Sequence, residues 1–278
     1  MPTPQADIRQ LHERLGRLSP PVDVHGSPSH GFVVAYRVPL EAGARLLPPG
    51  LSLREVGRTG LGMLCLCGGE FRGARVGKLA IPAPSHQDFH CRAIVDHRTA
   101  AGDVPAGYTL HYEASSRIVE LCSGNLSGLR HPPSRFACET DGEHWAVSCT
   151  SKEPLSCMSF STRPHLTSWT PPESTAFGSL RAASEFLLDL EGHLVHDYAR
   201  DKTSYRAREM RACDAAFCPE FASEFPLIGY LDEAFELGLE LDCALFLGAK
   251  RPARVAAQVR RTGVATDGDS AELPAGAG

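Results

Sequence analysis

Short segments of β-branched, aromatic and aliphatic residues, separated by glycine and proline, recur through the first half of the chain. The segments that we interpret as strands are Gly31–Val38, Leu51–Val56, Leu61–Cys67, Phe89–Val95 and Tyr108–Glu113. Glycine and proline interrupt regular backbone hydrogen bonding, so each segment is bounded by a turn signal. Because hairpins connect antiparallel strands directly, many short strands at this spacing predict a mainly antiparallel sheet.

The strongest local signal is Asp141-Gly142, which lies between Arg135–Thr140 and Glu143–Thr150. Asp-Gly is favoured in two-residue hairpin turns, because both turn positions require a positive φ. We therefore predict a β-hairpin that turns at this dipeptide.

Helices are predicted around the sheet at Ile8–Leu18, Leu40–Leu47, Ser116–Cys122 and Ser179–Leu190, the last of which begins with a capping serine. Residues 1–251 are interpreted as a single domain. Residues 252–278, which are rich in Ala, Arg and Gly, are interpreted as a disordered tail. The predicted fold class is α+β, with a closed β-barrel or a strongly curved sheet and peripheral helices.

Composition excludes several classes of protein. The formal net charge of −5 disfavours binding to a nucleic-acid backbone. No apolar run approaches the ~20 residues that span a bilayer, and the N-terminus lacks the pattern of a secretion signal. We therefore expect a cytoplasmic protein whose ten cysteines are reduced and mostly buried. Cys65 and Cys67 are interpreted as buried neighbours on one face of a strand.

Familiar nucleotide-binding and serine-hydrolase motifs are missing, since the chain contains no GxGxxG, GxxxxGK[ST] or GxSxG pattern. His86 and His90 have the spacing of a metal pair on a helix, but Pro82 and Pro84 just before them favour the start of a strand. We predict neither a metal nor a cofactor.

Charged residues interrupt several of the apolar strands. They are Arg37, Glu70, Arg72, His90, Arg92, Glu113 and Arg117. Alternate residues of a barrel strand point inward, so some of these side chains could converge on an interior ligand pocket. The alternative is that they lie on an outward, solvated face.

The run from Phe32 to Glu41, which contains Tyr36-Arg37, and the segment 45–53 that follows it resemble the early part of acetoacetate decarboxylase and its relatives. In that family a strand ending in Tyr-Arg leads into a short helix and a Leu-Pro-x-x-Leu turn. The resemblance spans about residues 31–151 and continues more weakly to Phe246. It implies a mostly antiparallel barrel with a central cavity, oligomerisation, and imine formation between a buried lysine and a substrate ketone.

Lysine is rare in this chain, which has only Lys78, Lys152, Lys202 and Lys250. By the resemblance, His131 occupies the position of the catalytic lysine, and Ser29 that of a substrate-binding arginine. A histidine cannot form the imine, but it suits general acid or base catalysis near neutral pH. Lys78 lies where the relatives carry an active-site carboxylate, so it is a candidate nucleophile or acid.

Three hypotheses follow. The first, which the resemblance favours, is a lyase, dehydratase or cyclase of secondary metabolism that acts by acid-base chemistry on a small substrate bearing a keto or carboxylate group. Its predicted residues are His131 as acid or base, Glu70 or Glu113 as carboxylate partner, and Arg72, Arg92, Arg117 and His90 as ligands of the substrate anion. The second is a non-catalytic ligand-binding protein on the same fold. The third is a Schiff-base decarboxylase or aldolase that uses Lys78.

Overall fold

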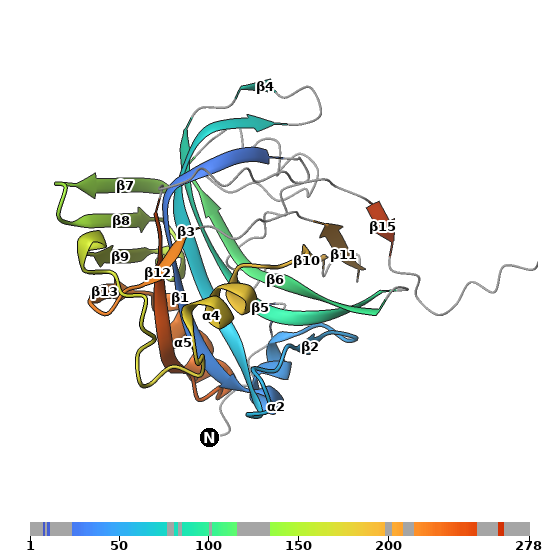
Figure 1. Ribbon diagram of the computed structural model, residues 1–278. Helices are drawn as coiled ribbons and strands as arrows, with labels where there is room; N and C mark the ends of the chain where they lie inside the picture. Colours follow the sequence, from blue (N-terminus) through green and yellow to red (C-terminus); the bar gives the residue numbers. More distant parts are fainter. Residues whose placement is uncertain are drawn as a thin grey trace, which may run out of the picture.

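The computed structural model describes residues 8, 10–11, 24–76, 81–82, 85–99, 102–115, 134–197, 202–207, 214–248 and 261–263. Two sheets form most of this part of the chain (Figure 1). The larger sheet has the order β12 (Ala215–Phe217), β14 (Glu240–Gly248), β1 (Val24–Pro39), β3 (Leu61–Val76), β5 (His86–Thr99), β6 (Gly102–Ala114), β10 (Gly192–Asp197), β11 (Lys202–Ala207) and β15 (Arg261–Gly263), with β2 (Ser52–Leu53) on β5 and β4 (Ile81–Pro82) on β3. The smaller sheet has the order β13 (Phe221–Glu224), β9 (Met158–Thr162), β8 (Trp145–Thr150) and β7 (Arg135–Thr140).

The predicted antiparallel sheet is confirmed: among the described strands, only β6 and β10 pair in parallel. Its long strands extend beyond the predicted segments, and β3 continues to Val76. The large sheet is curved, and its described edge strands, β12 and β15, do not pair with each other (Figure 1). Closure into a barrel therefore stays a prediction.

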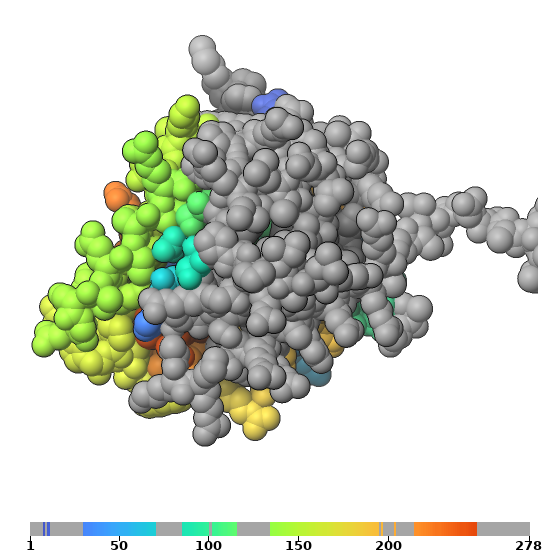
Figure 2. Space-filling model, turned by 90° about the horizontal axis from the view of Figure 1, so that it is seen from above, coloured from blue at the N-terminus to red at the C-terminus, as the bar shows by residue number. Residues whose placement is uncertain are grey.

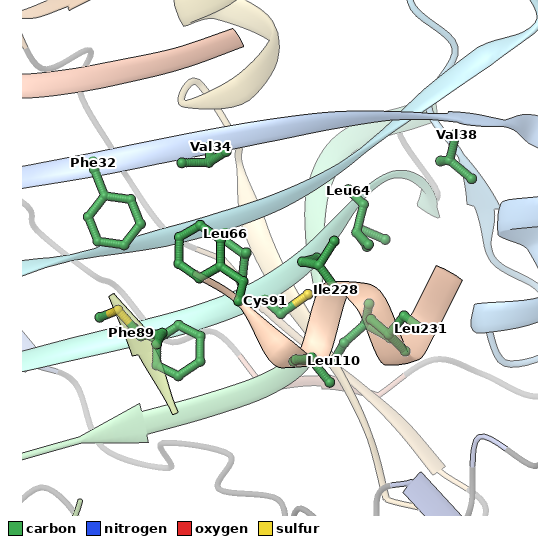
Figure 3. Packing of buried hydrophobic residues seen from close by; sticks show 14 of the residues in the cluster. Phe32, Val34, Val38, Leu64, Leu66, Phe89, Cys91, Leu110, Ile228 and Leu231 are labelled. Carbon is green, nitrogen blue, oxygen red and sulfur yellow. The ribbon is translucent and has the colours of Figure 1, made fainter. Parts of the chain in front are cut away.

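Both faces of the large sheet are covered, which explains why its central strands have continuous apolar runs. One face, which we call the α5 face, carries Phe32 and Leu66 and packs against the small sheet and α5 (Pro226–Phe235). Figure 3 shows Ile228 and Leu231 of α5 among residues of this cluster. The small sheet forms one side of the molecule when it is seen from above (Figure 2).

The opposite face of the large sheet, which we call the α4 face, carries Val33 and Cys65 and packs against α4 (Leu180–Leu187). The Ser179 hydroxyl accepts a hydrogen bond from the Ala182 N–H and caps this helix, as predicted, although the helix ends three residues earlier than Leu190. Because residues of a strand alternate between the two faces, neighbours in sequence belong to different cores.

The predicted hairpin is confirmed between β7 and β8, but the predicted two-residue turn is wrong. Residues 141–144 form a longer connection in which Gly142 has a φ of 92°, whereas Asp141 does not have a positive φ. Instead, the Asp141 carboxylate accepts hydrogen bonds from the backbone N–H groups of Glu143 and His144, at 3.0 and 2.7 Å. Asp141 thus stabilises the connection with its side chain, which mimics the hydrogen bonding of a backbone turn.

The remaining helical predictions have mixed outcomes. Leu40–Leu47 is confirmed as α2 (Leu40–Gly43) followed by the 3-10 turn η1 (Ala44–Leu46). Ser116–Cys122, most of Ile8–Leu18 and most of the tail lie outside the described residues. The sequence analysis missed α5 and the 3-10 turns η2 (Pro154–Ser156) and η3 (Pro164–Leu166). None of the helices in the described ranges has the length and apolar character needed to cross a membrane.

Candidate functional site

The register between β5 and β6 places the predicted site residues on two different faces. Glu113 is paired with Phe89, whose ring belongs to the core on the α5 face. His90 and Arg92 alternate with these core residues along β5, and Arg92 is paired with Cys65 of the α4 face. Glu113 therefore does not lie beside His90 and Arg92, and these three residues do not line one site.

On the α5 face, Glu113 is part of a buried polar cluster with His111 and Ser134. Nε2 of His111 lies 3.3 Å from Oε1 of Glu113, and the Ser134 hydroxyl donates a hydrogen bond of 2.5 Å to Oε2. The exposed fractions are 0% for His111, 7% for Glu113 and 6% for Ser134. This cluster is the candidate functional site, because a buried carboxylate and an imidazole can together hold and transfer a proton.

The surroundings of Glu113 favour its ionised form. Burial by itself raises the pKa of Glu113, but the His111 imidazole and the Ser134 hydroxyl, with a smaller contribution from Ser156, outweigh burial and lower the pKa below its usual value. Glu113 is therefore a carboxylate at neutral pH.

The His111 ring packs against Phe89 and lies close to the Glu113 carboxylate. Its centroid is 5.5 Å from that of Phe89, in an edge-on arrangement, and its Nε2 faces Glu113. Within the described part of the chain, both ring nitrogens of His111 are buried and neither forms a hydrogen bond, so the contact of Nε2 with Glu113 is an ion-pair contact only. An imidazole fixed on one side by a carboxylate can exchange a proton through the other nitrogen.

A cysteine next to this cluster is not a candidate nucleophile. Burial, followed by the negative charge of Glu113, raises the pKa of Cys149 to about 12. On the α4 face, burial likewise raises the pKa of Cys65 well above its usual value. Cys65 and Cys67 form no disulfide and are buried on the same face of β3, as predicted. Both Cys65 and Cys149 are therefore neutral thiols near neutral pH.

The other predicted site residues are described to different extents. Glu70 is half-buried on β3, where it is paired with Gln87 of β5 and His30 of β1. Gln87 is two residues from Phe89 and lies on the same face of β5, so Glu70 is on the α5 face, as Glu113 is. For Arg72 only the placement on β3 is described. Three residues lie outside the described ranges: Lys78, Arg117 and His131.

Sequence reasoning missed His111 and Ser134. The available signal for His111 was its position two residues before Glu113 in a predicted strand, which places both side chains on one face. Ser134 lies at the entry to β7 and had no such signal, because its contact with Glu113 joins residues 21 apart in the chain. No group of three or more His, Cys, Asp or Glu residues in the described ranges could hold a metal ion.

Comparisons with known proteins identify the fold. No family model matches the sequence, and no curated protein does. Among solved structures, acetoacetate decarboxylase from Legionella pneumophila is similar with a TM-score of 0.52 and 9% identity, over 84% of this chain and 87% of that one. An acetoacetate decarboxylase-like enzyme from Sphingomonas wittichii is similar with a TM-score of 0.50 and 12% identity, over 92% and 96% of the two chains.

A further structure of an acetoacetate decarboxylase has a TM-score of 0.50 and 8% identity, over 86% of this chain and 89% of that one. The chain therefore has the acetoacetate decarboxylase-like fold, and the family resemblance seen in the sequence is confirmed at that level. At such low identity the likeness concerns the fold, and the chemistry has to be argued from this chain's own residues.

Proposed function

We propose that this protein is a small-molecule enzyme that performs acid-base chemistry, as a lyase, dehydratase or cyclase, on a substrate bearing a keto or carboxylate group. In this proposal His131 is the acid or base that contacts the substrate, and Glu113 is its buried carboxylate partner. His111 lies beside Glu113 in the same cluster. The observation that carries the proposal is the hydrogen bond from Ser134 to Glu113.

The position of His131 in the sequence, close to Ser134, supports its pairing with Glu113. Ser134 follows His131 by three residues, and three residues span at most about 11 Å even when fully extended. His131 follows Glu113 by 18 residues in the sequence and lies outside the described residues. The short separation between His131 and Ser134 along the chain is the support for the pairing of His131 with Glu113 that the sequence analysis predicted.

The electrostatics of the pair support a role in proton transfer. An ionised carboxylate in a site of low water content stabilises a nearby imidazolium more strongly than it would in water. A histidine in such a place can take a proton from a carbon next to a ketone, and return it elsewhere on the substrate. Glu70 remains a second candidate carboxylate, and Arg72 and Arg117 remain candidates for orienting the substrate anion.

Hydrogen exchange on the substrate tests this proposal without knowledge of the complete reaction. The protein would be incubated in D₂O with a panel of 2- and 3-keto acids, and loss of the α-proton signal followed by NMR. We expect the wild-type protein to accelerate exchange for at least one compound. His131→Ala and Glu113→Gln should each reduce that rate roughly 100-fold or more, which is the range of general acid-base contributions.

Glu139→Gln is the matched control, because it makes the same chemical change at an exposed position on β7. It should exchange at the wild-type rate, and circular dichroism should show that all variants are folded. Wild-type exchange in His131→Ala would overturn the assignment of His131. Saturable binding of a keto acid without exchange in any protein would favour the non-catalytic ligand-binding alternative.

A further inference from the structure

Arg92 is a buried cation on the α4 face, on the other side of the sheet from His111 and Glu113. It is 1% exposed and lies opposite Cys65 of β3 and Thr109 of β6. Its Nη2 donates a hydrogen bond of 2.6 Å to the carbonyl oxygen of Leu187, the last residue of α4. Among the described residues no carboxylate forms an ion pair with Arg92, and its buried Nε has no hydrogen-bond partner.

Within the part of the chain that the structure describes, this arrangement leaves part of the positive charge of Arg92 without a counter-ion. The carbonyl end of a helix carries roughly half a negative charge, so the bond to Leu187 offsets some of the guanidinium charge. A full buried charge without a counter-ion is costly, and an unused buried donor adds to that cost. The adjacent thiol of Cys65 does not supply the missing charge, because burial raises its pKa and keeps it neutral.

Two histidines lie beside Arg92 on the same face. A Cβ atom added to Gly107 would be 3.1 Å from Cδ of Arg92 and 3.5 Å from Nδ1 of His193, so the arginine and this imidazole flank the same glycine. The ring centroid of His193 is in turn 6.3 Å from that of His90. Three strands, β5, β6 and β10, thus bring one permanent cation and two imidazoles close together.

Asp88 and Asp96 are the acidic residues nearest to Arg92 along β5, each four residues away, and Asp96 forms an ion pair with Arg54. Asp88 lies on the α4 face two residues before His90, and it accepts a hydrogen bond of 3.3 Å from the Tyr112 hydroxyl. It forms no ion pair with Arg92 in the described part of the chain. Within the described ranges, Arg92 thus has no carboxylate partner on its own strand.

We propose that Arg92, together with His193 and His90, forms an anion-binding site on the α4 face for a small oxyanion, namely a carboxylate or inorganic phosphate. The planar guanidinium, with a free Nε–H, suits the two oxygen atoms of such a group. The sheet separates this site from the His111–Glu113 cluster, so it is independent of the proposed catalytic role.

NMR of the arginine side chains tests the proposal directly. The Nε–H signal of Arg92 would be assigned through its side-chain connectivity, and followed in the full-length protein during titration with sodium formate and, separately, with sodium phosphate. Sodium perchlorate at equal ionic strength is the reference salt. We expect a saturable shift with at least one of the two oxyanions, and the better ligand identifies the carboxylate or the phosphate as the preferred chemistry.

Two variants and a control make the outcome decisive. Arg92→Gln should weaken binding at least tenfold and His193→Gln at least threefold, whereas Arg98→Gln should bind as the wild type does. Arg98 is on the same strand, but its side chain is 89% exposed and it pairs with Asp103. If Arg92→Gln does not fold, the wild-type titration and His193→Gln decide. No saturable shift, or a shift equal to that with perchlorate, overturns the proposal and leaves Arg92 as a cap of α4.

Discussion

Replacement of Ser134 by alanine tests the contact that ties the start of β7 to the buried carboxylate. The variant removes the hydroxyl that donates to Oε2 of Glu113 at 2.5 Å. Both residues are buried, so water does not replace the lost donor. A hydrogen bond to a charged group contributes roughly 1.5–3 kcal/mol to stability, and we expect S134A to lower the free energy of unfolding by about that amount at neutral pH.

The pH dependence of this loss is the sharper part of the prediction. The folded-state pKa of Glu113 is lowered, so its stabilisation is fully present above the unfolded-state pKa of about 4.3 and is lost as the pH falls through the folded-state value. Loss of the Ser134 donor raises the folded-state pKa. The stability difference between the wild type and S134A should therefore be largest near neutral pH and shrink in acid.

Urea unfolding, followed by the fluorescence of the buried Trp145, measures this difference at each pH. S168A is the control, because the Ser168 hydroxyl donates to an uncharged partner, the carbonyl oxygen of Thr170, at 3.2 Å. Its effect should not vary with pH. The reasoning is refuted if S134A costs less than about 0.5 kcal/mol, which is ordinary for a surface substitution, or if its cost is the same in acid and at neutral pH.

Three further predictions concern other parts of the molecule. Gly69→Ala should destabilise the fold by roughly 1–3 kcal/mol in urea unfolding, because its Cβ would lie 2.5 Å from the backbone oxygen of His30, which cannot turn aside as a side chain can. Asp242→Asn should cost on the order of 2 kcal/mol in the same assay, because the buried carboxylate accepts a 2.5 Å hydrogen bond from Thr175 just before α4; a cost near zero would contradict that role. Borohydride treatment with keto acids should leave the intact mass unchanged, whereas an adduct that disappears in Lys78→Ala would establish Schiff-base chemistry instead.

Much of the local structure was predictable because it depends on neighbours in the chain. The glycine and proline boundaries, the capping serine at Ser179 and the Asp-Gly signal all act within a few residues, and they predicted strands, α4 and the β7–β8 hairpin. The connection at Asp141 still differed from the prediction. The Asp141 backbone does not have a positive φ, and its carboxylate instead accepts hydrogen bonds from two backbone N–H groups. The short helix α5 was missed because its apolar residues do not distinguish a buried helix from a strand.

The sequence by itself determined that His111 and Glu113 share one face of a strand, and that His90 and Arg92 share one face of another, since side chains alternate with a period of two. Only the tertiary structure decided that these two faces are opposite. The register between β5 and β6, with its irregularity between Cys91 and Arg92, sets that relation, and a slip of one residue would reverse it. Contacts between strands fix the register, and for this reason a single expected site became a carboxylate–imidazole cluster on one face and a buried arginine on the other.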